Sequence, residues 1–558
     1  MQMAQEIKAA LERAFEQLGV SIPEGALLEH PSDLKNGDYA SGVALRAKVS
    51  PYEFARKIVE KLGSIEGVAK VEIAKAGFIN FHLAPSALAE TVEEARKDAW
   101  GRNDANKGKK VMVEYTDPNP FKEFHIGHLM SNAIGESVAR LIEFTGAEVK
   151  RANYQGDIGL HVAKAVFVKK KNPEIPWGVA YKMGNDLYDA YKNEIDEINR
   201  KLYEGNDSVI NALQIEGRKD SLAGFEVIYE KLGMEPRTNV EEFRYFDFYF
   251  FEKESWYIGK VIVEQNTPQV FQESDGAIVF HGENFDPSLH TRVFITSQGL
   301  PTYEAKELGL LKSKIEKDWK FDESITITAN EQKEYFKVVL AAAKQIAELS
   351  KAAEKTRHIT HGMMRFAEGK MSSRTGNVIT ALALLQDLYD VAKERAKESR
   401  AESHEKLAMQ VALAAVKYQI LRQASNKDII FDRERALSLE GDSGPYLQYA
   451  HARAHGVMEK AHEQNVTAAI DKNAEPTDLS RLLHRFPEAV EYAARELEPH
   501  LLTNYLLEFA SAFNRWYANE QILDGSSGSP HKVALTDAVR ATLRNGLWLL
   551  GIPAPEKM

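Results

Sequence analysis

The chain has 558 residues, of which 44% are hydrophobic and 27% are charged, so wholesale disorder and collagen-like repeats are excluded. At about 150 residues per domain, this length predicts three or four domains. The lack of cysteine excludes disulfides, a thiolate nucleophile and Cys-ligated zinc or iron–sulfur sites, and the net charge of −11 argues against coating by nucleic acid through bulk charge.

Neither a leader nor a membrane span is predicted. The first residues lack the basic-then-apolar layout of a signal peptide. No stretch approaches the ~20 apolar residues that a membrane helix needs. The sequence also contains no fixed-period repeat. We therefore expect a cytoplasmic, multidomain protein that has no membrane partner.

The N-terminal part of the chain carries signals for both helix and strand. Residues 4–18 have apolar side chains at helical spacing, and Gly19 follows as a stop. Residues 71–73 and 78–83 alternate in polarity, which predicts paired strands. The polar stretch 101–108 is typical of a linker. These signals predict an N-terminal α+β domain over residues 1–100.

A parallel-sheet domain is predicted beyond the linker. Residues 111–115 form a buried-strand pattern that must end at the proline-containing segment 117–120, because proline cannot donate to a sheet ladder. A helical stripe then runs up to Gly146, and residues 148–152 start another strand. Strand, loop, helix and strand in this order are the βαβ unit of a Rossmann-type nucleotide-binding sheet, an α/β fold.

The rest of the chain divides into a heterogeneous part and a helical part. Residues 165–290 are interrupted by Asn, Gly and Asp clusters and are predicted to be an insertion. Strand patterns return at 293–295 and 325–328, and nearly everything from about residue 385 is helical. Between 497 and 516 the apolar residues follow helical spacing, which predicts a single core-facing helix face. We therefore expect a C-terminal all-α helical bundle.

The motif His125-Ile126-Gly127-His128 stands between a predicted strand and a predicted helix. A helix N-terminus offers unpaired N–H groups and a partial positive charge, which suit phosphate. Two imidazoles beside it add donors for charge that develops on a phosphate, and Gly127 allows a nucleobase to approach the backbone. Two ordinary loop histidines are the alternative interpretation.

A second polar motif lies far downstream, at 368–377. Glycines flank a Lys/Ser/Arg cluster there, which predicts a loop that closes over a polyphosphate and supplies cations to the transition state. The alternative is an exposed polar turn with a surface lysine.

Together, the two motifs resemble the HIGH and KMSKS signatures of class I aminoacyl-tRNA synthetases. Further segments resemble the arginyl-tRNA synthetase family and run along nearly the whole chain outside the predicted insertion: 37–40, 77–81, 114–119, 153–159, 299–303, 441–453 and 554–558. The second motif departs from the consensus, because Ser373 takes the fourth position, which is usually lysine, and Arg374 takes the fifth.

This resemblance implies an arginine–tRNA ligase, which converts L-arginine and ATP to arginyl-adenylate and transfers arginine to the 3' end of its tRNA, releasing AMP and pyrophosphate. It implies a tRNA-elbow-binding domain at 1–100, a class I catalytic domain at 108–435 with its insertion at about 165–290, and a helical anticodon-binding domain at 436–558. ATP is expected as a Mg²⁺ complex, without a tightly bound cofactor or a metal site in the protein. The family is usually monomeric.

The resemblance also assigns residues to the substrates. The arginine pocket is expected to comprise Glu114, Asn119, Tyr303, Glu307 and Gln332. A carboxylate can hold the planar guanidinium through two hydrogen bonds, although the family usually has Asp where this chain has Glu307. The expected catalytic residues are His125, His128 and Lys370. Contacts to ATP are expected from His125, Gly127, His128, Lys370, Met371, Ser372 and Ser373. Candidates for stacking on tRNA bases, with core packing as the alternative, are Tyr446, Tyr449 and Trp516.

Two kinds of alternative function remain open. A class I synthetase for glutamate or glutamine would call for cationic residues in the pocket, and one for cysteine normally ligates zinc through Cys. A catalytically silent tRNA-binding paralogue would be expected to lack one of the two motifs, and both are present. We further predict one cleft, at the carboxyl ends of the parallel strands, that brings together Glu114, Asn119, His125, His128, Tyr303 and Lys370.

Overall fold

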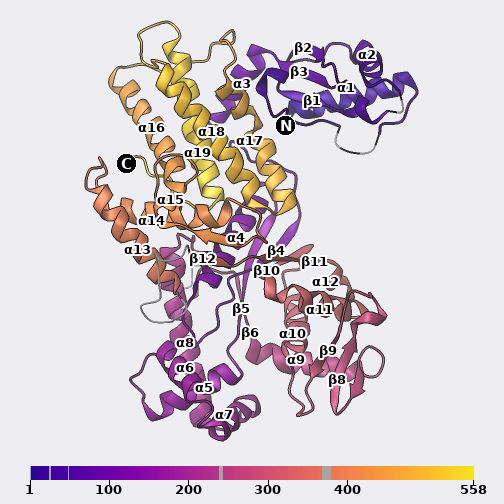
Figure 1. Cartoon of the computed structure of the whole chain (residues 1–558), viewed down its shortest axis with the longest axis vertical. Coiled ribbons are helices and arrows are strands. Elements are labelled where there is room, and N and C mark those ends of the chain that lie inside the picture. Colours follow the sequence, from indigo (N-terminus) through magenta and orange to yellow (C-terminus); the bar gives the residue numbers. More distant parts are fainter. Residues whose placement is uncertain (1, 24, 26, 48, 238–242, 367–378) are drawn as a thin grey trace.

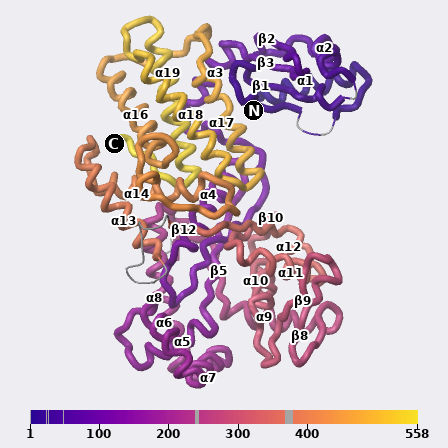
Figure 2. The backbone as a smooth tube through the Cα atoms, viewed as in Figure 1, coloured from indigo at the N-terminus to yellow at the C-terminus, as the bar shows by residue number. Residues whose placement is uncertain are grey.

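The structure is a computed structural model, and it describes residues 2–23, 25, 27–47, 49–237, 243–366 and 379–558. A central sheet lies between a large helical region and two smaller lobes (Figure 1). The N-terminal unit projects from the far end of the helical region, away from both lobes (Figure 2). The sheet is therefore the junction at which the parts of the chain meet.

The N-terminal unit is a small antiparallel sheet covered by helices, with the strand order β1-β3-β2. Its elements are α1 (Gln2–Leu18), β1 (Tyr39–Ser41), α2 (Pro51–Leu62), β2 (Val68–Ile73) and β3 (Ile79–Leu83). Ile7, Leu11 and Phe15 recur on one face of α1 and are buried against the sheet. The helix and the strand pair predicted for this part are confirmed. Helix α3 (Pro85–Ala95) leads into the rest of the chain.

The central sheet is parallel throughout and has the order β11-β10-β4-β5-β6. Its strands are β4 (Lys110–Glu114), β5 (Glu148–Gln155), β6 (Phe248–Phe251), β10 (Glu323–Ala329) and β11 (Thr356–His361). Helix α4 (Ile126–Phe144) connects β4 to β5, and the register of these two strands pairs Val113 with Arg151. The predicted βαβ unit and Rossmann-type α/β fold are confirmed.

Helices cover both faces of this sheet. Helix α4 lies on one face, where Val138 and Leu141 pack in a core shared with the C-terminal helices. The other face is covered by α9 (Glu252–Gln265), α10 (Tyr303–Glu316), α11 (Lys333–Gln345) and α12 (Ser350–Glu354). A Cβ atom on Gly259 of α9 would lie 1.9 Å from the Ala305 carbonyl oxygen of α10, so these two helices can approach this closely only with glycine at that position. The close crossing fixes α10 against the sheet.

The stretch 165–290, predicted as one insertion, is divided by a strand of the central sheet. Its first part belongs to a helical lobe formed by α5 (Leu160–Lys171), α6 (Trp177–Asp186), α7 (Lys192–Glu204) and α8 (Ser208–Lys231). Strand β6 then pairs parallel with β5. The second lobe contains a three-stranded antiparallel sheet of β7 (Gln272–Ser274), β8 (Ala277–His281) and β9 (Thr291–Ile295). The prediction missed β6 because a strand of 4 residues, all aromatic, shows no period.

Helices dominate the C-terminal part, which confirms the predicted all-α bundle. They are α13 (Ala381–Ala396), α14 (His404–Leu421), α15 (Arg433–Ala436), α16 (Gly444–Glu463), α17 (Asp478–Glu496), α18 (Pro499–Asn519) and α19 (Ser529–Leu549). A short parallel pair, β12 (Met364–Phe366) and β13 (Ile429–Phe431), lies beside them. In the described residues, no helix combines the length and the apolar character that crossing a membrane requires.

The single helix face predicted over 497–516 is interrupted at its start. Leu497 has a φ of 58° and ends α17, and Pro499 opens α18. Pro499 can open α18 because proline is well tolerated in the first turn of a helix. The apolar spacing therefore continues across the break. Leu502, Leu506 and Phe509 are buried as the pattern predicts.

Candidate active site

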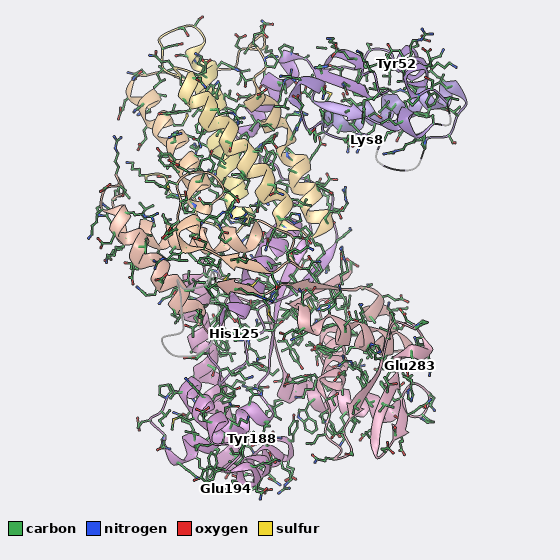
Figure 3. The ribbon with its side chains drawn as sticks, viewed as in Figure 1. Lys8, Tyr52, His125, Tyr188, Glu194 and Glu283 are labelled. Carbon is green, nitrogen blue, oxygen red and sulfur yellow. The ribbon has the colours of Figure 1, made fainter. Side chains whose placement is uncertain are left out.

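A cavity of about 470 Å³ opens at the carboxyl ends of the central strands. Its walls come from the end of β4, the start of α4, the start of α10 and the turn after β10, elements that are far apart in the sequence. The predicted residues that line it are Glu114, Asn119, His125, Gly127, His128, Tyr303, Glu307 and Gln332. His125 lies where the helical region meets the two lobes (Figure 3). Of the six residues predicted to converge on one cleft, Glu114, Asn119, His125, His128 and Tyr303 line this cavity, and Lys370 lies outside the described residues.

One end of the cavity is built by the first turn of α4. His125 is the N-cap residue, and its Nδ1 accepts a hydrogen bond from the Gly127 N–H at 3.1 Å. The Nδ1 of His128 accepts one from the His125 N–H at 3.3 Å, and the two rings stack with centroids 3.7 Å apart. Because both Nδ1 atoms are acceptors, each neutral imidazole carries its proton on Nε2 and can donate from there.

Electrostatics keeps these two imidazoles neutral. Burial, helped by the positive charge of Lys122 and by neighbouring histidines, lowers the pKa of His125 and lowers that of His128 well below its usual value. This end of the cavity, the histidine end, thus presents uncharged N–H donors beside a helix N-terminus, a combination that suits phosphate oxygens.

The chain that follows the second motif returns to the histidine end. The Ile126 N–H donates to the Ile379 carbonyl at 3.2 Å, and the Ala381 N–H donates to the Phe124 carbonyl at 3.0 Å. His125 and Thr380 form an isolated bridge. The four predicted ATP contacts of that motif lie outside the described residues: Lys370, Met371, Ser372 and Ser373.

The opposite end of the cavity is acidic. Glu114, at the end of β4, is 2% exposed, and its Oε2 lies 2.9 Å from the Nζ of Lys314. Despite this short separation, no donor among the described residues is aligned for a hydrogen bond to that oxygen. From the described residues, Glu307 accepts a long hydrogen bond, 3.4 Å, from the Tyr335 hydroxyl and no other. The carboxylates of this acidic end thus retain acceptor capacity for a ligand.

Among the described residues, the acidic end has more carboxyl groups than lysines that pair with them. Glu252 is paired with Lys306 at 3.0 Å, and Asp117 accepts a hydrogen bond from the Tyr154 N–H at 2.7 Å. Desolvation, followed by the charge of Glu114, raises the pKa of Glu307 to about 8 and raises that of Asp117 well above its usual range. A cation that entered this end would relieve both effects.

Sequence reasoning missed several of these groups. Glu252 follows the short strand β6, and Lys306 and Lys314 lie on α10. The sequence of α10 did contain one indication. Glu307 and Lys314 are seven positions apart and therefore share a helix face. A lysine on the face of a pocket carboxylate indicates a buried partner for a carboxylate. The register of α10 against β4, which the fold alone supplies, was the missing information.

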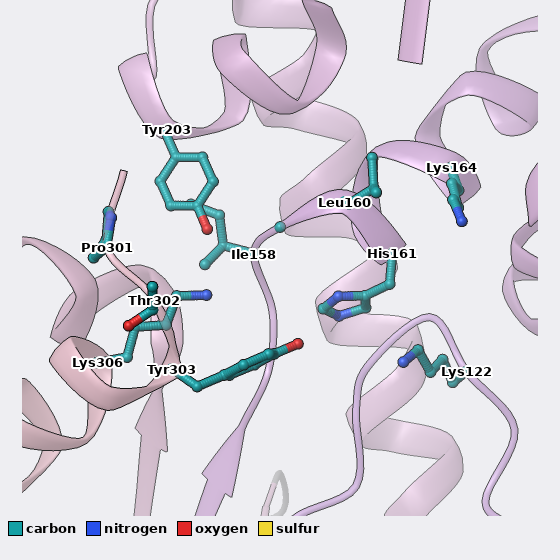
Figure 4. A pocket seen from close by; sticks show the side chains of 11 residues that line it. Lys122, Ile158, Leu160, His161, Lys164, Tyr203, Pro301, Thr302, Tyr303 and Lys306 are labelled. Carbon is teal, nitrogen blue, oxygen red and sulfur yellow. The ribbon is translucent and has the colours of Figure 1, made fainter. Parts of the chain in front are cut away.

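Tyr303 stands at the mouth of the cavity with 64% of its surface exposed. Its ring lies 5.2 Å from the Nζ of Lys306 and borders a second cavity of about 470 Å³. In Figure 4, Lys122, His161, Tyr203 and Tyr303 surround this space. Gln332 is exposed on a 3₁₀ turn after β10. These two predicted residues therefore border the entrance, whereas the glutamates lie deeper.

The tRNA candidates lie on facing helices α16 and α18. The Tyr446 hydroxyl donates to Ser511 at 3.3 Å, and the Arg453 guanidinium lies 4.6 Å from the centre of the Tyr449 ring. Trp516 packs against Phe513 with ring centroids 6.3 Å apart. All three candidates are half-buried, so each combines packing with an exposed edge.

Metal binding by the protein alone finds no support in the described part of the chain. No group of three or more His, Cys, Asp or Glu side chains is arranged there to hold an ion. The carboxylates of the acidic end are distributed around the cavity and two of them are engaged by lysines. Their arrangement suits an extended organic cation better than a compact metal ion.

Comparison with known proteins identifies the family. The sequence matches "tRNA synthetases class I (R), catalytic domain" over residues 92–433, "DALR anticodon binding domain" over 447–558 and "Arginyl tRNA synthetase N terminal domain" over 1–83. The arginine–tRNA ligase of Clostridium acetobutylicum is 31% identical, with 95% of this chain and 96% of that protein covered. The ligase of Clostridium perfringens is 29% identical, with 99% of each covered.

The structural comparison agrees. The Thermus thermophilus arginyl-tRNA synthetase superposes with a TM-score of 0.82 at 26% identity, covering 99% of this chain and 100% of that one. The activity predicted from the sequence, arginine–tRNA ligation with ATP, is thereby confirmed over the other class I specificities. This chain belongs to the arginyl-tRNA synthetase family of class I aminoacyl-tRNA synthetases.

Proposed function

We propose that the cavity activates arginine by binding its two substrates at opposite ends. The guanidinium lies at the acidic end between Glu114 and Glu307, and the phosphates of ATP lie at the histidine end. The observation that carries this proposal is the pairing of buried carboxylates with neutral imidazole donors in one cavity. A cationic side chain and an anionic nucleotide would meet between these ends, with the arginine carboxylate facing the α-phosphorus.

The reaction consists of two displacements that need no protein nucleophile. An oxygen of the arginine carboxylate attacks the α-phosphorus of ATP, the bond to the bridging oxygen breaks, and pyrophosphate leaves. A ribose hydroxyl at the tRNA 3' end then attacks the carbonyl carbon of the adenylate, and AMP leaves. Positioning and electrostatic stabilisation supply the catalysis. His125 and His128 donate to the phosphate oxygens as charge develops on them.

The remaining predicted contacts take supporting roles. Asn119, Tyr303 and Gln332 complete the arginine pocket, and Gly127 leaves room for the adenine base. Lys370 acts on the pyrophosphate side, with Met371, Ser372 and Ser373 as further contacts to ATP. Mg²⁺ enters with ATP as part of the substrate.

The body of the tRNA is held outside the cavity, and only its 3' end reaches the adenylate. We assign residues 1–100 to its elbow and residues 436–558 to its anticodon, within a monomer that works in the cytoplasm. The catalytic domain spans 108–435. The half-buried rings of Tyr446, Tyr449 and Trp516 offer edges on which loop bases can stack, which needs few charges on the protein.

ATP–pyrophosphate exchange tests the division of the cavity. Wild-type protein is expected to exchange with arginine, in the presence of cognate tRNA, and not with lysine or citrulline. Glu307→Gln should raise the KM for arginine without changing the KM for ATP. Exchange that depends on another amino acid, or an equal effect of this variant on both substrates, would refute the proposed arrangement.

A further inference from the structure

A buried lysine supports the acidic end from behind. Lys314 is 3% exposed, and its Nζ lies 2.9 Å from Glu114 Oε2 and 3.5 Å from the Thr326 hydroxyl. Glu114 lines the cavity, whereas Lys314 is not part of its lining. The lysine therefore contacts β4 and β10 and reaches the ligand space only through the carboxylate of Glu114.

The two lysines that serve this end both come from α10. Lys306 compensates Glu252, and Lys314 compensates Glu114. Asp117 and Glu307 have no salt bridge within the described residues. Burial and the nearby Glu114 favour their neutral forms, as described above. Glu114 is thus the carboxylate of the guanidinium side that forms an ion pair with the protein.

A buried carboxylate keeps its charge only when a partner compensates its desolvation, and removal of that partner leaves an uncompensated ion. The ion pair of Lys314 and Glu114 meets this condition through distance, but the ammonium is not aligned for a hydrogen bond to Oε2. The ion pair therefore holds the carboxylate in place while Oε2 keeps capacity to accept hydrogen bonds from a ligand.

We propose that Lys314 is a positioning residue for arginine: it acts through Glu114, whose carboxylate it holds in place to receive the guanidinium. This inference rests on the proposed function of the acidic end. A planar guanidinium spreads its charge and can reach Glu114 and Glu307 together, whereas a compact ammonium ligand would concentrate its charge close to that of Lys314. Lys314 thereby also favours arginine over lysine.

A double-mutant cycle tests whether Lys314 works through Glu114. Lys314→Met in the wild-type background is expected to raise the KM for arginine by about tenfold or more, because Glu114 loses its compensating charge. In a Glu114→Gln background the same change is expected to leave that KM unchanged or to lower it, since it then removes a buried cation that repels arginine. The KM for ATP should stay within about twofold throughout.

The matched control is Lys312→Met on the same helix, where the lysine pairs with Glu316 and Glu348 on the exposed side. It should behave as wild type. If Lys314→Met alone does not fold, the comparison of Glu114→Gln with the double variant Glu114→Gln/Lys314→Met still decides, because the double variant leaves no unpaired charge. A further rise in the arginine KM in that double variant, or a wild-type KM in Lys314→Met, would overturn the inference. An unchanged arginine KM in Glu114→Gln would instead refute the proposed pocket.

Discussion

The two ends of the cavity are built in different ways. The histidine end comes from four consecutive residues, 125–128, whose backbone and side chains cap one another at the start of α4. The acidic end draws its groups from the ends of β4 and β6 and from α10, and buried ion pairs link them. The proposed phosphate site thus rests on a local motif, whereas the proposed guanidinium site depends on tertiary structure.

The electrostatic states of the two ends differ accordingly. Burial lowers the pKa of His125 and His128 and raises the pKa of Asp117 and Glu307, so desolvation favours the neutral form at both ends. The imidazoles can act while neutral, because a neutral N–H already donates to phosphate. The carboxylates must lose protons to bind a cation. The histidine end can therefore donate hydrogen bonds without any change of protonation. At the acidic end, Asp117 and Glu307 must lose their protons as the cation binds.

The largest expected effect is on the histidine end. His128→Ala should lower the rate of arginine-dependent pyrophosphate exchange by about 10²–10³-fold, the usual loss when one preorganised donor to developing charge is removed. Arginine affinity, measured by calorimetry, should stay within about twofold, because the acidic end is untouched. His281→Ala, on the remote strand β8, is the matched control. A parallel loss of arginine affinity would show that the two ends are not independent.

The next effect isolates the acidic end. Glu114→Gln should raise the KM for arginine about a hundredfold, because truncation of a buried charge pair costs about 2–5 kcal/mol and ~1.4 kcal/mol is one decade. The KM for ATP should not change. Glu323→Gln controls for general effects on the domain. Glu323 lies at the amino end of β10, at the opposite end of the strand from the cavity. Thermal unfolding separates lost affinity from lost stability.

The same contrast explains what the sequence could predict. His125, Gly127 and His128 form a contiguous pattern, so a helix N-terminus with phosphate donors was predictable from local spacing. Glu114 was assigned to the arginine pocket by family resemblance, and its ion-pair partner Lys314, which the structure supplies, was not identified from sequence spacing.

Features that depend on packing were less accessible. Strand β6 was hidden in the predicted insertion, and Glu252, which follows it, was missed with it. The break at Leu497 was hidden because apolar spacing continues across the start of α18. The close crossing of α9 and α10 rests on Gly259, and periodicity does not reveal it. Periodicity defines elements and their faces, but it does not define which distant elements meet.

The smallest expected effect is the pH dependence that only the acidic end should show. The pKa of Glu307 is raised from 4.5 to about 8 in the folded chain, so this carboxyl is mostly protonated near neutral pH and must release its proton to bind a guanidinium. The arginine KM should therefore fall about tenfold between pH 6.5 and 8 and then level off.

The same titration affects stability. The stabilising contribution of the protonated Glu307 is present in full below pH 4.5 and is lost as the pH rises through about 8. Because arginine binds the ionised form of Glu307, it should protect the protein from thermal unfolding more strongly at pH 8 than at pH 6.5. Glu307→Gln should abolish the slope of the KM profile while raising KM, and the ATP profile should be the same in both proteins. A wild-type arginine KM that is flat over this range, or a slope that persists in Glu307→Gln, would remove Glu307 from the guanidinium site.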